Sequence, residues 1–146
     1  MSEAPVPLLG PASGGFVALS VASLDRMLPW YHDTLGFTVY ATGVAPGGAP
    51  GGAIRFALLQ QGNALVELLQ LPGARPLGAV APGTAPAQLH GFFKSGFVVA
   101  DLDAAYRRVQ RLRLPLAYAL GQPPNGPYRS FGLRDPEGNL LQLFGR

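Results

Sequence analysis

The alternation of apolar and polar positions predicts a strand followed by a helix near the start of the chain. Residues 16–21 (FVALSV) form an apolar run that ends in a β-branched residue, which is typical of a strand. Ser23 is placed to cap a helix that follows this run. Apolar residues then recur at helical spacing, at Leu24, Leu28, Tyr31 and Leu35.

One residue interrupts this predicted helix and another ends it, and three more strands follow. Pro29 lies inside the helical pattern, where it would end or kink an ordinary helix. Gly36 closes the helix as a C-cap glycine. The strands are predicted at residues 37–40, 54–59 and 64–69, with a glycine-rich loop at 44–52 and a hairpin turn at 60–63.

The same order of elements starts again in the second half. Residues 71–91 are rich in Pro, Gly and Ala without periodicity, which indicates a linker. A strand at 93–100 and a helix capped by Asp101 come next, and strands are predicted at 116–120, 128–133 and 140–144. The segment that begins at Val21 (VASLD) matches the segment that begins 78 residues later at Val99 (VADLD). The chain therefore contains an internal repeat.

The repeat predicts an α+β fold. We expect two βαβββ modules that form a curled mixed sheet around a cleft, with helices on the outer face. The chain would be one domain, residues 1–146, with module one at about 14–70, the linker at about 71–91 and module two at about 92–146.

Composition narrows the class of protein. An apolar fraction of 48% with 13% charged residues permits a packed core. The net charge of +3 comes with one basic run, Arg107 to Arg113, which we interpret as a solvated helix face because no nucleic-acid-binding motif accompanies it. Because the chain has no cysteines, thiolate metal sites and cysteine nucleophiles are excluded. No signal peptide and no membrane-spanning apolar run is recognised, so we expect a cytoplasmic protein.

Three segments resemble one known superfamily. Residues 30–37 (WYHDTLGF) resemble the end of the first helix in the vicinal oxygen chelate superfamily, which includes glyoxalase I, bleomycin-resistance proteins and extradiol dioxygenases. Residues 99–106 (VADLDAAY) resemble the start of its second helix, and residues 135–143 (DPEGNLLQL) its closing strand. The resemblance extends from about Gly14 to the end of the chain, and it implies paired βαβββ modules and, in many members, a dimer.

The resemblance also implies four positions for metal ligands. Enzymes of the superfamily bind one divalent metal through inward side chains of the first and fourth strands of each module. The matching residues here are Phe16, Glu67, Lys94 and Gln142; a shift of one residue would replace Lys94 by Ser95. A phenyl ring has no lone pair, and a lysine ammonium is a cation without an acceptor. Catalytic metals normally need about three protein ligands, so we expect neither a metal nor another cofactor.

The same four residues are candidates for ligand binding. Glu67, Lys94 and Gln142 would face the cavity, although Glu67 at a strand edge and Lys94 at the surface are open alternatives. Phe16 would form a cavity wall or part of the ordinary core. Arg129 either contacts a ligand anion or is a surface residue. The two histidines, His32 and His90, are interpreted as a helix residue and a loop residue outside the inward strand positions.

The function expected from these residues is binding without chemistry. Bleomycin-resistance proteins sequester a drug without metal, and we expect this chain to bind a small, partly apolar molecule in its cleft, as a homodimer. The alternative is a vicinal oxygen chelate enzyme, a lyase, isomerase or dioxygenase, with relocated metal ligands or with Glu67 as a metal-free base. We also expect the Lys94 ammonium to pair with Glu67 through Gln142, within one chain or across the dimer.

Overall fold

The computed structural model describes residues 14–46, 52–85, 90–121 and 127–145. The first module contains the elements β1 (Gly15–Ser20), α1 (Leu24–Pro29), η1 (Trp30–Thr34), β2 (Thr38–Ala45), β3 (Ile54–Gln61) and β4 (Ala64–Gln70). The second contains β5 (Ser95–Val98), α3 (Leu102–Arg111), β6 (Leu116–Gly121), β7 (Arg129–Arg134) and β8 (Leu140–Gly145). The repeat of strand, helix and three strands is therefore confirmed, and the fold is α+β.

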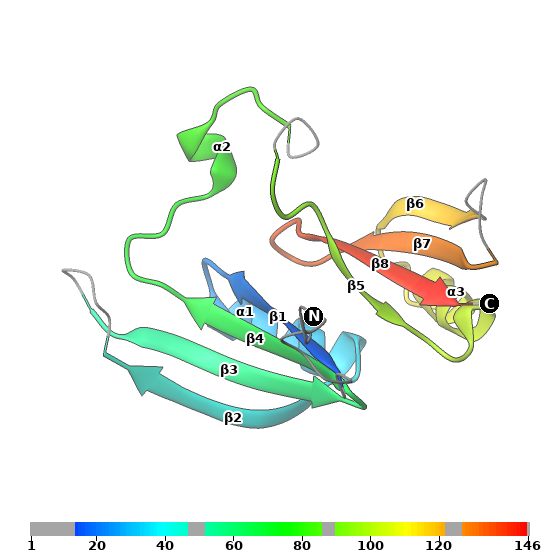
Figure 1. Ribbon diagram of the computed structural model, residues 1–146, viewed down its shortest axis with the longest axis horizontal. Helices are drawn as coiled ribbons and strands as arrows, with labels where there is room; N and C mark the ends of the chain where they lie inside the picture. The colour runs from blue at the N-terminus through cyan, green and yellow to red at the C-terminus, as the bar shows by residue number, and fades with distance from the viewer. Residues whose placement is uncertain (1–13, 47–51, 86–89, 122–126, 146) are drawn as a thin grey trace, which may run out of the picture.

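The strands are divided between two four-stranded sheets of identical topology (Figure 1). Sheet A has the order β1-β4-β3-β2 and sheet B the order β5-β8-β7-β6. In each sheet the first strand runs parallel to the last, and the other pairs are antiparallel. α1 lies behind sheet A and α3 lies behind sheet B, which leaves the opposite face of each sheet without a helix (Figure 1). We call these the open faces of sheets A and B.

Local side chains start both principal helices. The Ser23 side chain accepts a hydrogen bond from the backbone N–H of Arg26, and the Asp101 side chain accepts one from Ala104 at 2.8 Å. Each satisfies a backbone donor that the first helical turn leaves without an intrahelical partner. The capping roles predicted from the sequence are confirmed.

Pro29 changes the type of the first helix rather than stopping it. α1 ends at Pro29, and the chain continues as the π-helical turn η1, in which the Leu35 N–H donates to the Trp30 carbonyl. A proline has no N–H to donate to the preceding turn, so the helix widens beyond it. Gly36 then ends the helix with a φ of +83°, a backbone conformation that favours glycine.

One hydrophobic cluster fills the space between the helices and the sheets. Its helical side chains come from α1, η1 and α3, and its strand side chains come from β3, β4, β7 and β8. The fully buried members include Met27, Tyr31, Leu59, Val66, Leu68, Leu102, Phe131, Leu133 and Leu141. Because strand residues alternate between faces, burial of these positions places their neighbours on the open faces.

Two local predictions need correction. The predicted linker contains a one-turn helix, α2 (Leu77–Val80), which the absence of periodicity did not indicate. β2 continues into the predicted glycine-rich loop, because Val44 and Ala45 still pair with Arg55 and Ile54 of β3. Residues 47–51 of that loop lie outside the described residues.

The two modules meet through the helix of the first and a turn of the second. The Phe37 and Phe97 rings lie 5.2 Å apart between centroids. The turn at residues 135–139 packs on α1, where the Glu137 carboxylate accepts hydrogen bonds of 2.9 Å from the backbone N–H groups of Ala22 and Ser23. Within the described residues, the helices are all too short or too polar to span a lipid bilayer.

Candidate functional site

Glu67 lies at the centre of the open face of sheet A. Its neighbours in β4, Val66 and Leu68, are fully buried beneath α1, so the Glu67 side chain is on the other side of the strand. Across the sheet it is flanked by Ala18 of β1 and Leu58 of β3. A carboxylate thus stands on an otherwise apolar part of the sheet.

The equivalent position in sheet B is Gln142. Gln142 pairs with Gly96 of β5 as Glu67 pairs with Ala18 of β1. Phe16 and Lys94 are also equivalent, because Phe16 lies two residues before Ala18 and Lys94 lies two residues before Gly96. This is the alignment expected from the repeat. The structure therefore brings Lys94 and Gln142 together in one module, and Phe16 and Glu67 together in the other.

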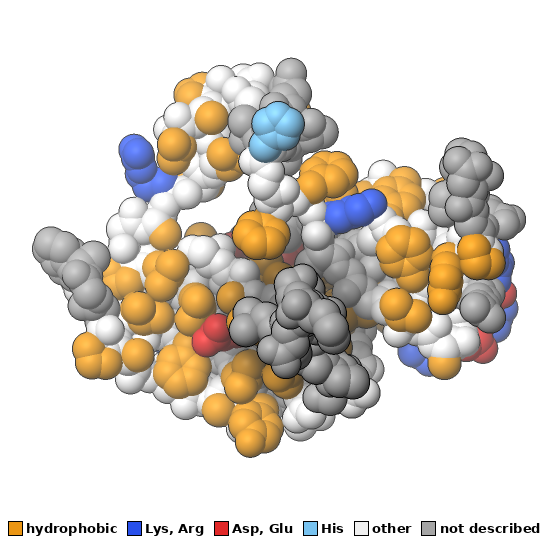
Figure 2. Space-filling view, viewed as in Figure 1, with side chains coloured by type: hydrophobic (Ala, Val, Ile, Leu, Met, Phe, Trp, Pro, Cys, Tyr) orange, Lys and Arg blue, Asp and Glu red, His pale blue; other side chains and the backbone are white. Residues whose placement is uncertain are grey.

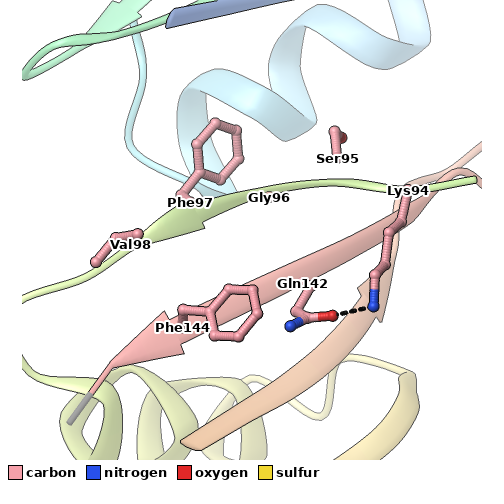
Figure 3. A pocket seen from close by; sticks show the side chains of 7 residues that line it. All are labelled: Lys94, Ser95, Gly96, Phe97, Val98, Gln142 and Phe144. Carbon is pink, nitrogen blue, oxygen red and sulfur yellow. Dashed lines mark hydrogen bonds between the residues drawn. The ribbon is translucent and has the colours of Figure 1, made fainter. Parts of the chain in front are cut away.

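A cavity of about 230 Å³ lies beside β5 and β8 (Figure 3). Its lining includes Lys94, Gly96, Val98, Gln142 and Phe144. The Lys94 ammonium donates a hydrogen bond to the Gln142 side-chain carbonyl, and Figure 3 shows these two side chains pointing toward each other with the Phe144 ring beside them. The cavity thus has a hydrogen-bonding end and an apolar wall, a common design of small-molecule sites.

Hydrophobic side chains gather on the side of the molecule that carries both open faces (Figure 2). Phe16 on β1 is 67% exposed and Val98 on β5 is 77% exposed. Large side chains of this kind are ordinarily covered, and exposed apolar patches mark interaction sites. Phe16 therefore lies on an open face, as a wall residue would, and is not part of the core.

Four residues that line this cavity were missed from the sequence: Gly96, Phe97, Val98 and Phe144. Tyr118 of β6 lies over Gly132, where an added Cβ would be 2.2 Å from the tyrosine ring. Its hydroxyl is buried, and burial raises the pKa of this phenol above its ordinary value. The sequence could have indicated Val98 and Phe144. Val98 lies four residues after Lys94 and Phe144 lies two residues after Gln142, and residues an even number apart in a strand share a face.

Arg129 lies on the helix side of sheet B and not in the cleft. Its neighbours Ser130 and Gly132 pair with Phe144 and Gln142 on the open face, so alternation directs Arg129 toward α3. There the guanidinium binds both carboxylate oxygens of Asp103, at 2.7 and 2.9 Å. Hydrogen bonds from this guanidinium hold the pKa of Asp103 below its ordinary value. Arg129 is therefore not part of the candidate site.

The expected pair between Lys94 and Glu67 does not form within the chain. The two side chains belong to different sheets, and in the described ranges no ion pair or hydrogen bond involves the Glu67 carboxylate. The histidines are also separate from the site. His32 is exposed on η1 with Nδ1 2.6 Å from the Asp33 carboxylate, and His90 is exposed ahead of β5.

Residues 15–143 match the model of the Glyoxalase/Bleomycin resistance protein/Dioxygenase superfamily. The chain belongs to this superfamily. The match covers both modules and includes the turn at residues 135–139. A comparison with curated proteins gives no match.

Several solved structures share the fold of this chain. TioX from Micromonospora sp. ML1 is 23% identical, with a TM-score of 0.61 over 90% of this chain and 94% of its own. Lactoylglutathione lyase from Agrobacterium tumefaciens is 21% identical, with a TM-score of 0.62 over 92% and 94%. TnmS3, an antibiotic binding protein from Streptomyces sp. CB03234, is 20% identical, with a TM-score of 0.61 over 94% and 98%.

The residues expected at the superfamily's metal positions do not fit a divalent metal. Of Phe16, Glu67, Lys94 and Gln142, one is a carboxylate, one is a neutral amide, one is a cation and one has no donor atom. Across the residues that the structure describes, no group of three or more His, Cys, Asp or Glu side chains could hold a metal ion.

Proposed function

We propose that this protein binds a small, partly apolar molecule in its cleft without a metal ion. The observation that carries the proposal is the cavity beside β5 and β8, where Val98 and Phe144 form an apolar wall and Lys94 and Gln142 form a polar end. An ammonium and an amide N–H₂ both donate hydrogen bonds. A ligand with an acidic or carbonyl group on an aromatic or aliphatic body matches this arrangement. That a protein named as antibiotic binding has the same fold supports binding as the function.

The test is a thermal-shift panel of aromatic carboxylic acids and neutral polycyclic amides, followed by titration calorimetry of those that stabilise the protein. Val98→Trp should fill the cavity and abolish binding, because Val98 lines it and is exposed enough to accept a larger side chain. Val44→Trp is the matched control, since Val44 is an exposed strand valine outside this cavity. Equal ligand affinity in the two variants would show that the ligand does not bind in this cavity.

Metal independence is tested separately. Elemental analysis after mild purification and dialysis should give far less than one Zn, Ni, Mn or Fe per chain. Ligand affinity should be unchanged by a chelator, because no protein–metal–ligand bond is lost. A retained stoichiometric metal would refute this part of the proposal.

A metal-free enzyme with Glu67 as a general base is the second candidate. It is favoured by one observation, the position of the Glu67 carboxylate on the open face without an ion-pair partner among the described residues. A base must be free to approach a substrate proton. Exchange of acidic C–H protons in a bound ligand, followed by NMR in deuterated water and lost in Glu67→Gln, would favour the enzyme over the binding protein.

The proposed setting is a cytoplasmic homodimer. A chain without cysteines needs no oxidising compartment to form disulfides. The two sheet faces that no helix covers suit association with a second copy of the chain.

A further inference from the structure

A second cavity, of about 390 Å³, lies at the ends of β1 and β4. Its walls are residues 21–22 after β1, residues 53 and 55 around the start of β3, and residues 70–74 at the end of β4. β1 and β4 are parallel and lie side by side (Figure 1), so their carboxyl ends meet at this cavity. It shares no residue with the cavity beside β5 and β8.

Two polar side chains line this cavity from the helix side of sheet A. Arg55 of β3 pairs with Gln70 of β4, two residues after the buried Leu68, so alternation places both side chains on the face that α1 covers. Their contacts agree with this placement. The Arg55 guanidinium binds Asp25 of α1 at 2.7 and 3.3 Å, and the Gln70 Oε1 accepts a hydrogen bond of 2.8 Å from the Leu24 N–H. The cavity is therefore on the opposite side of the sheet from Glu67 and the cleft.

Both side chains keep hydrogen-bond donors for a ligand. A guanidinium has five N–H groups, and Asp25 accepts two of them. The Gln70 Oε1 is used by Leu24, so the Nε2 amide is the other end of the side chain, and within the described residues it has no acceptor. The lining contains no Asp or Glu. Free donors and one positive charge favour an anionic ligand.

A tight turn forms an apolar wall of the same cavity. Pro72 and Gly73 are its central residues, and the Ala74 N–H donates to the Leu71 carbonyl at 3.2 Å. Gly73 has a φ of +74°, the conformation that a type II turn requires at this place. The proline ring fixes its own φ, so this wall is ordered before a ligand binds. Together with Val21, the turn gives the body of a ligand an apolar surface.

The side chain of Gln70 explains why this space exists in the first module. In the second module Gly145 takes its place, because Gly145 pairs with Arg129 as Gln70 pairs with Arg55. Arg129 likewise binds an aspartate of its helix, so the ion pair alone does not make a cavity. There Leu102 packs directly on the strand end, 2.6 Å from the position of a Cβ added to Gly145. In the first module the glutamine amide lies between α1 and the strand end.

We propose that the cavity at the ends of β1 and β4 binds a small carboxylic acid with an apolar body, as a second ligand site separate from the cleft. The carboxylate accepts hydrogen bonds from the Arg55 guanidinium and the Gln70 Nε2, and the body packs on Val21 and Pro72. The Arg55–Asp25 pair is exposed and contributes little to stability, so a ligand carboxylate can join it at low cost. This inference does not depend on ligand binding in the cleft.

Benzoate titrated into ¹⁵N-labelled protein tests the site through the backbone amide signals in NMR spectra. The signals of Ala22, Gly73 and Ala74 should shift at millimolar benzoate. They should shift equally in Val98→Trp, which fills the other cavity, so failure of cleft binding leaves this result unaffected. Benzamide has the same ring without the charge and should bind at least about tenfold more weakly. Shifts confined to β5, or equal affinity for benzoate and benzamide, would overturn the proposal.

Substitution of Arg55 tests the anion contact. Arg55→Met should weaken benzoate binding at least about tenfold, because the charged donor is lost. Arg108→Met, at an exposed position of α3, is the matched control and should bind benzoate as the wild type does. Equal benzoate affinity in both variants would contradict the site. Circular dichroism checks that each variant is folded.

Asp25→Asn separates a ligand-binding role of Arg55 from a structural one. If Arg55 binds the ligand, removal of the competing carboxylate should leave benzoate affinity unchanged or higher. If the ion pair only fastens α1 to the sheet, Asp25→Asn should weaken benzoate binding as Arg55→Met does, and the proposal is then wrong. Should Arg55→Met fail to fold, Asp25→Asn and the comparison of benzoate with benzamide still decide.

Discussion

The hydroxyl of Tyr31 donates a hydrogen bond of 3.0 Å to the carboxylate of Asp135, which lies 104 residues later in the chain. Tyr31 is fully buried and Asp135 is 4% exposed. The same carboxylate accepts hydrogen bonds from the backbone N–H groups of Glu137 and Asn139 and from the Asn139 side chain. These hydrogen bonds order the turn between β7 and β8 internally. The bond from Tyr31 also connects this turn to η1 of the first module.

Removing that hydroxyl should destabilise the protein. Tyr31→Phe deprives a buried carboxylate of one donor while the ring packing is kept, and a loss of about 1–3 kcal/mol in the free energy of unfolding is expected. Urea denaturation followed by circular dichroism measures it. Tyr40→Phe is the control, because the Tyr40 side chain is 70% exposed, and its effect should be within about 0.5 kcal/mol. Equal effects from both variants would show that the Tyr31–Asp135 bond contributes nothing.

The same tyrosine predicts a loss of stability at alkaline pH. Burial, followed by the nearby Asp135 charge, raises the pKa of Tyr31 far above its ordinary value in the folded chain. Above a pH of about 10 the unfolded chain releases this proton while the folded chain retains it, so the unfolded state is favoured as pH rises. The stability of the wild type should therefore fall more steeply from about pH 9.5 to 11 than that of Tyr31→Phe. Parallel curves would contradict the prediction.

Glu137 provides a second connection between the modules. Its carboxylate, 12% exposed, accepts from the backbone N–H groups of Ala22 and Ser23 ahead of α1. Glu137→Ala should cost about 1–3 kcal/mol, because two backbone donors lose a charged acceptor. Glu137→Gln keeps one acceptor oxygen and should lie between the wild type and the alanine variant. Asp33→Ala, an exposed carboxylate, serves as the control in the same urea titration.

Gly132 and Tyr118 predict a coupled pair of substitutions. Gly132→Ala would place a Cβ 2.2 Å from the Tyr118 ring, so the ring must leave its place, at a cost of about 1–3 kcal/mol. The cost should shrink when Tyr118→Ala is also present, and a double-mutant cycle measures the difference. Gly78→Ala in α2 meets nothing within 4 Å and should not destabilise the protein. Additive effects of the first two changes would contradict the contact.

The sequence by itself determined the elements and their repetition. Apolar alternation and helical spacing are local properties, and so are the caps at Ser23 and Asp101, because each joins groups three residues apart. The offset of 78 residues between Val21 and Val99 aligns Phe16 with Lys94, whereas Gln142 was matched to Glu67 through the closing-strand motif of the superfamily. The paired βαβββ modules were also implied by the superfamily that these segments resemble, whereas the order of the strands in each sheet came from the structure.

Only the tertiary structure decided which groups meet across long separations. Nothing near Ala22 indicates that its N–H is satisfied by Glu137, and the alternation around Arg129 does not by itself say which face α3 covers. The pairing expected between Lys94 and Glu67 depended on how two sheets are placed, and the packing of the 135–139 turn on α1 fixes that placement. Local patterns give each strand two faces, but the contacts between modules decide what each face meets.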